Sequence, residues 1–215
     1  MPGRRGGLLR RYWIKTLRAG WLLYLLVLAV FSLGLVCGAL NIDFLPPGGM
    51  ASLHDYLSAF LKEAGGGQVD TGQLARQVMY DKLYFMTALY LAGLTVIGIP
   101  VVLVLVFLRG FALGFTVAFL SRDLALQGLF LAAVAIMPQN LLFLPALFVG
   151  AVAALTFALL LFPRRSGMGG KIWGSLVRYT GIMVAVVAVA LGAGLVEIYL
   201  SPWLTRILAG MIIPR

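Results

Sequence analysis

Long apolar runs alternate with short polar stretches along the chain. A helix needs about 20 predominantly apolar residues to cross a bilayer, and several runs reach that length. The pattern predicts an all-α polytopic membrane protein with about five transmembrane helices, at 20–40, 83–108, 110–121, 124–162 and 178–199. Within 83–108 we expect Pro100 to kink the helix and Arg109 to mark its cytoplasmic end.

The middle of the chain has the least regular crossing pattern. The run at 110–121 has about 12 residues, which is roughly 18 Å of helix against a hydrocarbon core of about 30 Å. We expect this run to cross outward as a short helix and 124–162 to return as one long, broken element.

The stretch MPQNLLFLPAL at 137–147 interrupts one of the most apolar runs. Each proline removes a backbone donor, and lipid cannot satisfy amide side chains. We expect a broken or re-entrant helix around Pro138, shaped by Gln139, Asn140 and Pro145, in which the amides bind backbone groups that proline leaves free. Two other interpretations stay open: docking of a partner, and binding of a small solute by a broken helix, as in transporters.

Two pairs of glycines recur at a spacing of four residues inside apolar runs. Gly34 and Gly38 lie in 20–40, and Gly110 and Gly114 lie in GFALGF. Glycines at this spacing give one helix face without side chains, which lets another helix approach closely. We therefore interpret all four as helix-packing residues.

The one sizeable polar region is 41–82. After a turn at FLPPGGM, the stretch SLHDYLSAFLKEA has the spacing of an amphipathic helix, and a second polar helix is expected to begin near Thr71. Such a helix must lay its apolar face on the membrane, on the bundle or on another protein. Tyr56, Phe60 and Leu61 are therefore candidates for partner docking, with packing on the bundle as the alternative.

Composition and charge placement support a membrane protein and predict its orientation. The chain is 62% hydrophobic and 11% charged, with a mean hydropathy of +1.02 and a net charge of +10. Basic residues gather in 1–19 and 163–177, whereas 41–82 holds most of the acids. The positive-inside rule then predicts a cytoplasmic N-terminus and 163–177 loop, with 41–82 and the tail at 200–215 outside. Basic residues beside a membrane serve lipid contact and topology, so no nucleic-acid partner is expected.

The inventory of reactive side chains predicts no enzyme. There is one histidine, His54, and one cysteine, Cys37, so neither a zinc site nor an intramolecular disulfide is expected. No nucleotide-binding, serine-hydrolase or metalloprotease motif occurs. We assign no catalytic, cofactor-binding or metal-binding residue.

Several stretches together resemble a known family. They are VIGIPVVLVLVFLRGFALGFTVAFL, MPQNLLFLPAL, VRYT and VEIYLSPWL, with DYLSAF in the outer region. In order and spacing, from about 20 to 205, they resemble stage II sporulation protein M of endospore-forming bacteria.

The resemblance implies a role that composition does not. That family acts in engulfment at the mother-cell and septal membrane, with sporulation proteins D and P, which cut peptidoglycan. It implies a non-enzymatic scaffold that assembles and localises these hydrolases. The competing hypothesis is a transporter or channel component that binds a small solute at the broken helix near Pro138.

Overall fold

The computed structural model describes residues 5–44, 71–161 and 172–212, together with 46, 48, 49, 52, 53 and 55. Nearly all of the described residues are helical, and none of them forms a strand. Four stretches in them are long and apolar enough to cross a membrane: Trp21–Phe44, Gly98–Arg122, Asn140–Leu160 and Trp173–Ile198. The predicted all-α polytopic membrane fold is therefore confirmed, with four helices of this kind in the described part of the chain.

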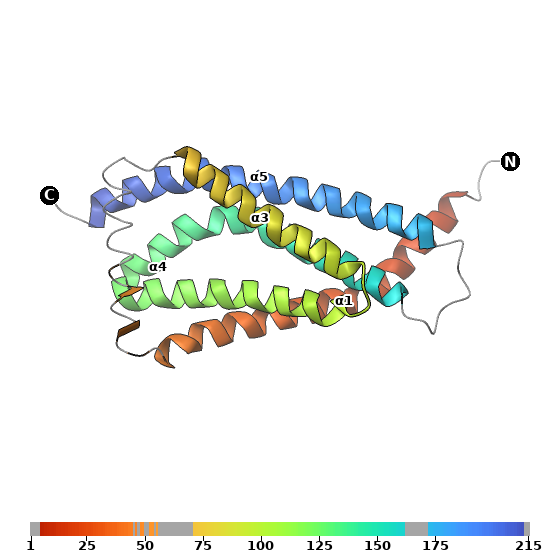
Figure 1. Cartoon of the computed structure of the whole chain (residues 1–215), viewed down its shortest axis with the longest axis horizontal. Helices are drawn as coiled ribbons and strands as arrows, with labels where there is room; N and C mark the ends of the chain where they lie inside the picture. Colours follow the sequence, from red (N-terminus) through yellow and green to blue (C-terminus); the bar gives the residue numbers. More distant parts are fainter. Residues whose placement is uncertain are drawn as a thin grey trace.

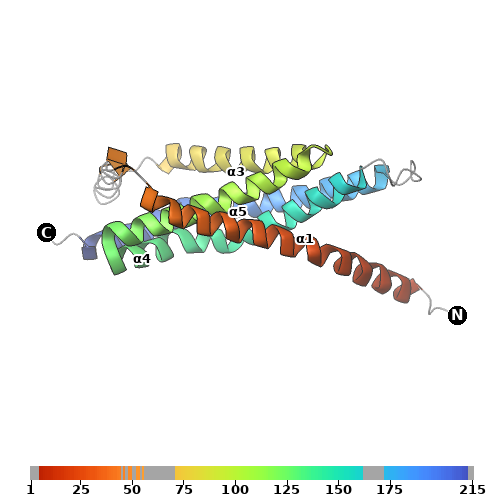
Figure 2. The same ribbon diagram turned by 90° about the horizontal axis from the view of Figure 1, so that it is seen from below.

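The helices form an elongated bundle around one long element. Its elements are α1 (Arg5–Asn41), the short 3₁₀ helix η1 (Ile42–Phe44), α3 (Thr71–Gly93), α4 (Gly98–Leu160) and α5 (Ile172–Ile212). The helix α4 folds back on itself (Figure 1), and we call Gly98–Arg122 its first arm and Asn140–Leu160 its second arm. It contacts α1, α3 and α5, and α3 also contacts α5. The core therefore lies between the two arms of α4, α3 and α5, with α1 against α4 (Figures 1 and 2).

The ends of the bundle carry different parts of the sequence. The beginning of α1, the end of α4 and the beginning of α5 lie at one end (Figure 1). The end of α1, the beginning of α3 and the end of α5 lie at the other. The two basic segments of the chain therefore border the same end of the bundle, which is the relation that the positive-inside rule requires.

The boundary between α3 and α4 differs from the expectation of one helix over 83–108. The helix α3 begins at Thr71, near the predicted start, but ends at Gly93, and a turn over 94–97 leads into α4. Pro100 is the third residue of α4, where its missing N–H is not needed by the helix. It therefore helps to begin a helix and does not kink one. The turn closes through the N–H of Thr95, which donates to the carbonyl of Ala92 at 3.1 Å.

This boundary also changes the position of Arg109. We expected it to end the second span, but it lies inside the first arm, 11 residues after Gly98 and 13 before Arg122. The expected short span at 110–121 is likewise the second half of the same arm. Arg109 is therefore an intramembrane residue.

The four packing glycines lie where α1 crosses the first arm of α4. A β-carbon added at any of them would overlap a backbone carbonyl oxygen of the facing helix. Gly34 and Gly38 of α1 face the carbonyl oxygens of Phe107 and Phe111. Gly110 and Gly114 of α4 face those of Phe31 and Leu35. The two helices thus touch backbone to backbone, and only glycine fits at these positions.

Candidate functional site: a charged cluster inside the bundle

An ion pair joins α3 to α5 inside the bundle. The Nζ of Lys82 lies 2.8 Å from Oε2 of Glu197, and the lysine side chain is only 5% exposed. Its position follows from the sequence of α3, because Val78, Lys82, Met86 and Leu89 recur on the buried face at helical spacing. A charge in such a place is stable only with a partner, and Glu197 supplies it.

A second cation lies beside this pair. Arg109, from the first arm of α4, has its Cζ 4.5 Å from the centroid of the Phe143 ring, and the Nζ of Lys82 lies 4.7 Å from the same centroid. A ring face attracts cations, and Phe143 is fully buried in the second arm. Glu197 and Asp81 are both close enough to attract Arg109 electrostatically. One aromatic ring therefore collects two cations, whose mutual repulsion is offset by acids from α3 and α5.

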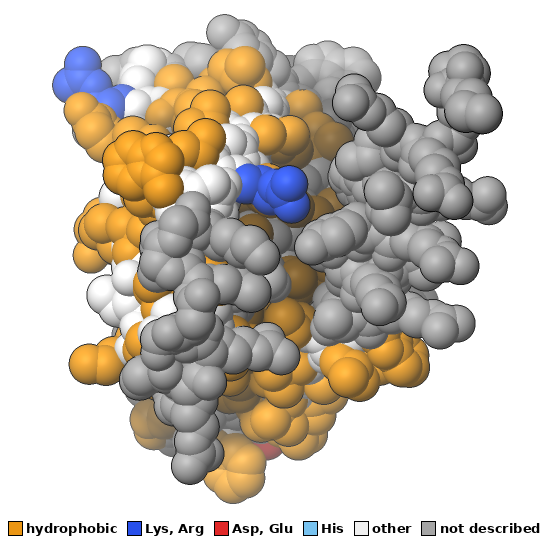
Figure 3. Space-filling view, turned by 90° about the vertical axis from the view of Figure 1, so that its right-hand side faces the viewer, with side chains coloured by type: hydrophobic (Ala, Val, Ile, Leu, Met, Phe, Trp, Pro, Cys, Tyr) orange, Lys and Arg blue, Asp and Glu red, His pale blue; other side chains and the backbone are white. Residues whose placement is uncertain are grey.

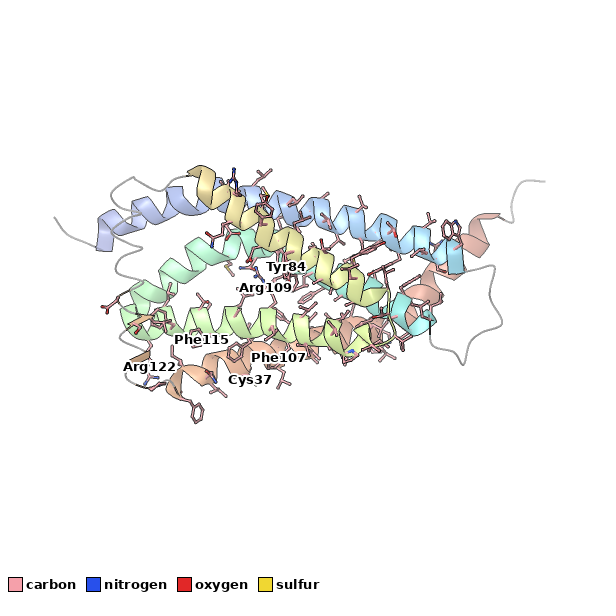
Figure 4. The ribbon with its side chains drawn as sticks, in the orientation of Figure 1. Cys37, Tyr84, Phe107, Arg109, Phe115 and Arg122 are labelled. Atoms are coloured by element: carbon pink, nitrogen blue, oxygen red, sulfur yellow. The ribbon has the colours of Figure 1, made fainter. Side chains whose placement is uncertain are left out.

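The amide of Asn140 belongs to the same region. Asn140 is buried and precedes Phe143 by three residues, so the two side chains share a face of the second arm. We define the charged cluster as Asp81, Lys82, Arg109, Asn140, Phe143 and Glu197. It draws residues from α3, both arms of α4 and α5 (Figure 4 labels Arg109 between the arms).

Arg109 lies well inside the first arm, whereas Asn140 begins the apolar stretch of the second arm and Glu197 is the last residue but one of Trp173–Ile198. At 1.5 Å per residue, Arg109 lies roughly 16 Å from the start of the first arm and roughly 20 Å from its end. Its neighbour Gly110 packs on the backbone of Phe31, which stands 10 residues after Trp21 and 13 before Phe44 in the span of α1. Ionisable residues at this depth are costly and are by default candidates for function.

Aromatic contacts fix the neighbouring part of α3 against α5. The rings of Tyr90 and Tyr179 stack at 5.3 Å, and Tyr179 stacks on Phe157 at 4.9 Å. The hydroxyl of Tyr179 donates to the carbonyl of Tyr90 at 2.9 Å, and a β-carbon at Gly93 would overlap that hydroxyl. The tyrosine of the VRYT stretch is thus a structural contact that holds α3 in register with the charged cluster.

The other residues singled out from the sequence lie apart from this region or outside the described structure. Pro145 is exposed on the second arm and lies within the helix. The side chains of Pro138 and Gln139, and the docking candidates Tyr56, Phe60 and Leu61, lie outside the described residues. Among the described residues no group of histidine, cysteine, aspartate and glutamate is arranged to hold a metal.

A surface ion pair connects η1, which follows α1, to the far end of the first arm. Arg122 donates to Asp43, and both side chains are more than half exposed. Figure 4 shows Arg122 beside the end of α1, well away from Arg109. This pair provides an exposed counterpart to the buried pair of Lys82 and Glu197.

Of the six cluster residues, the sequence analysis considered only Asn140 as a candidate site residue, and it took Arg109 for the end of a span. A signal was present for Arg109, because the apolar run continues on both sides of it from 98 to 121. An arginine that interrupts an otherwise continuous span is a candidate intramembrane charge.

Comparison with known families gives one match over most of the chain, including every residue of the charged cluster. The family model of Stage II sporulation protein M matches residues 27–202. Comparisons with curated proteins and with solved structures found no match.

Proposed function

We infer the function from a premise that the comparison establishes: the chain belongs to the Stage II sporulation protein M family. It is a membrane protein of a family linked to sporulation. On this basis we propose that it is a non-enzymatic scaffold, which assembles and localises peptidoglycan hydrolases, sporulation proteins D and P, at the septal mother-cell membrane during engulfment. The observation that carries the proposal is the family match, which spans the polar segment 41–82 as well as the bundle.

The arrangement of the bundle supports this role for 41–82. The described elements within this segment, η1 and the beginning of α3, lie at the end of the bundle opposite the beginning of α1 (Figure 1). If the basic N-terminal segment is cytoplasmic, as we propose, then 41–82 faces the cell wall. The two ends of the segment each carry an ion pair: the exposed pair of Asp43 with Arg122 on one side and the buried pair of Lys82 with Glu197 on the other. A docking segment anchored at both ends loses less entropy on binding than a free one.

A pair of matched double variants tests the scaffold. Tyr56→Ala with Phe60→Ala removes the apolar face of the predicted external helix, and Ser58→Ala with Lys62→Ala changes its polar face. We expect the first variant to lower co-purification of proteins D and P from sporulating cells by tenfold or more at equal protein level, because a buried aromatic contact is worth about 2 kcal/mol or more. We expect the second to leave it unchanged. Normal septal localisation of both hydrolases in cells that lack this chain would refute the proposal.

The charged cluster favours a second candidate function. Charges inside a membrane bundle next to a helix that turns back are also a way to build a transport site, and Asn140 lies in that region. Replacement of Gln139 and Asn140 by leucine separates the two candidates. A scaffold whose amides are structural loses abundance in the membrane, whereas a transporter keeps its abundance and loses flux of protons or inorganic ions in proteoliposomes.

A further inference from the structure

The net charge of the chain is concentrated at one end of the bundle. We define the basic end as residues 1–19 and 163–178, which border the beginnings of α1 and α5 (Figure 1). These two segments hold ten of the 17 lysines and arginines and none of the seven acids. The rest of the chain carries seven bases and seven acids, so the whole net charge of +10 belongs to the basic end. Such a concentration of one charge attracts anionic partners.

The basic end lies where two membrane spans begin. Trp21 starts the span of α1 and Trp173 starts that of α5, and both side chains are more than half exposed. Tryptophan at the start of a span is typical of the headgroup region of a bilayer. Arg18 precedes Trp21 by roughly 4.5 Å along the helix axis, and Arg178 follows Trp173 by roughly 7.5 Å. Both positions are therefore close to phospholipid headgroups, and Figure 3, which faces this end, shows basic side chains among hydrophobic ones.

Arg178 has open space beside it on the surface of α5. Gly174 precedes it by four residues and Gly181 follows it by three, so both glycines share its helix face. At each glycine, the position of an added β-carbon has no neighbouring atom within 4 Å. Arg178 is itself exposed, and it forms no ion pair with an acid among the residues that the structure describes. Its guanidinium group can therefore be reached by a ligand from outside the bundle.

We propose that the basic end binds anionic phospholipids, and that Arg178 holds a headgroup phosphate in the space left by Gly174 and Gly181. Arginine suits this ligand, because its planar guanidinium group donates two hydrogen bonds to one phosphate. The long stem of the side chain lets the charge reach the headgroup level from a position inside the span. Val177 and Ile182, which are exposed beside it, offer apolar contact to the acyl chains. The proposal is independent of the scaffold role, since it concerns the opposite end of the bundle from 41–82.

Quenching of tryptophan fluorescence by brominated lipids tests the proposal at both ends of the chain. One full-length variant keeps only Trp173 and another keeps only Trp203, near the opposite end of α5, with phenylalanine at the other tryptophan positions. Each is reconstituted in vesicles of phosphatidylglycerol and phosphatidylcholine, in which one or the other lipid is brominated. Both leaflets have the same composition, so the orientation of the chain does not affect the result. At Trp173 we expect phosphatidylglycerol to bind at least about threefold more tightly than phosphatidylcholine, and at Trp203 we expect no preference.

Variants of the chain that keeps Trp173 separate the Arg178 site from general charge. Arg178→Gln should lower the preference for phosphatidylglycerol at least about twofold, and Gly181→Leu should do the same by filling the space without changing the charge. Arg206→Gln, which removes one charge from the last part of α5, should leave the preference unchanged, and melting temperatures show which variants are folded. Equal binding of both lipids at Trp173 overturns the proposal, and the basic end then serves topology or an acidic protein. A preference that survives in the folded Arg178 and Gly181 variants, or falls equally in Arg206→Gln, also overturns it.

Discussion

Removing either partner of the buried ion pair of Lys82 and Glu197 should lower the free energy of unfolding, but by different amounts. Glu197→Gln removes the carboxylate at 2.8 Å from Nζ of Lys82, and Lys82 and Arg109 then share the Phe143 ring without that acid. Breaking a buried pair by removing one partner costs about 3–5 kcal/mol. Because Glu197 is 26% exposed, we expect a loss of about 3 kcal/mol, near the lower limit of that range.

The opposite variant should cost less. Lys82→Met keeps most of the apolar stem and leaves Glu197 with Arg109, which it already attracts. The double variant Lys82→Met with Glu197→Gln leaves neither an excess buried cation nor an excess acid at the pair. Its loss should therefore fall below the sum of the two single losses, by about 1–3 kcal/mol as for other contacting pairs.

The assay is the free energy of unfolding in mixed micelles, measured by titration with a denaturing detergent. Asp43→Asn, which breaks the exposed pair with Arg122, is the matched control and should cost at most about 1 kcal/mol. A larger loss for Lys82→Met than for Glu197→Gln, or single losses that simply add in the double variant, would refute this reading of the charged cluster.

Two further predictions concern packing and topology. Gly114→Ala should destabilise the protein by about 1–3 kcal/mol, because the added methyl group overlaps the backbone of α1. Gly181 has open space around it, so Gly181→Ala should stabilise the protein by up to about 1 kcal/mol. The free energy of unfolding in the same micelles measures both effects, and equal effects would contradict the close crossing of α1 and α4. A cysteine at Ser58 in a Cys37→Ala background should react with an impermeant maleimide on intact protoplasts, and labelling only after lysis would reverse the proposed orientation.

The sequence predicted those helices whose position follows from nearby residues, such as a long apolar run or a glycine-rich boundary. Apolar length predicted helices in the regions of α1 and α5, and the start of α3 near Thr71 followed from a polar helix after a glycine-rich stretch. The four-residue glycine spacing indicated a close helix contact, since only a face without side chains permits one. Which helices would meet at that face was not predictable, because the spacing on one helix does not identify its partner.

The boundary between α3 and α4 could not be found from hydropathy. The turn at 94–97 consists of Leu94, Thr95, Val96 and Ile97, which are as apolar or nearly as apolar as the helices on either side. Pro100 was read as a kink because its position in the first turn of a new helix is visible only once that helix is known to begin at Gly98. Because the expected span began at 83 and not at Gly98, Arg109 was expected at the end of a span, whereas it lies in the middle of one.

The charged cluster depends on the return of α4. Phe143 meets Arg109 only because the second arm comes back alongside the first, and Asn140 reaches the same level for the same reason. No local pattern places residues 34 positions apart in contact. The structural role expected for the amides of MPQN stays a prediction, and the cations near Asn140 come from elements that the motif does not include.

The bundle uses two different means to hold helices together where the hydrophobic effect gives no preference for helix over lipid. The helix α1 is held by backbone contact at glycines, which needs no polar group and gives dispersion energy only when the fit is close. The helices α3, α4 and α5 are held by charges that cannot leave each other without facing hydrocarbon. This second means explains how α3, which is not apolar enough to be a membrane span alone, stays in the bundle, because Lys82 of α3 binds Glu197 of α5.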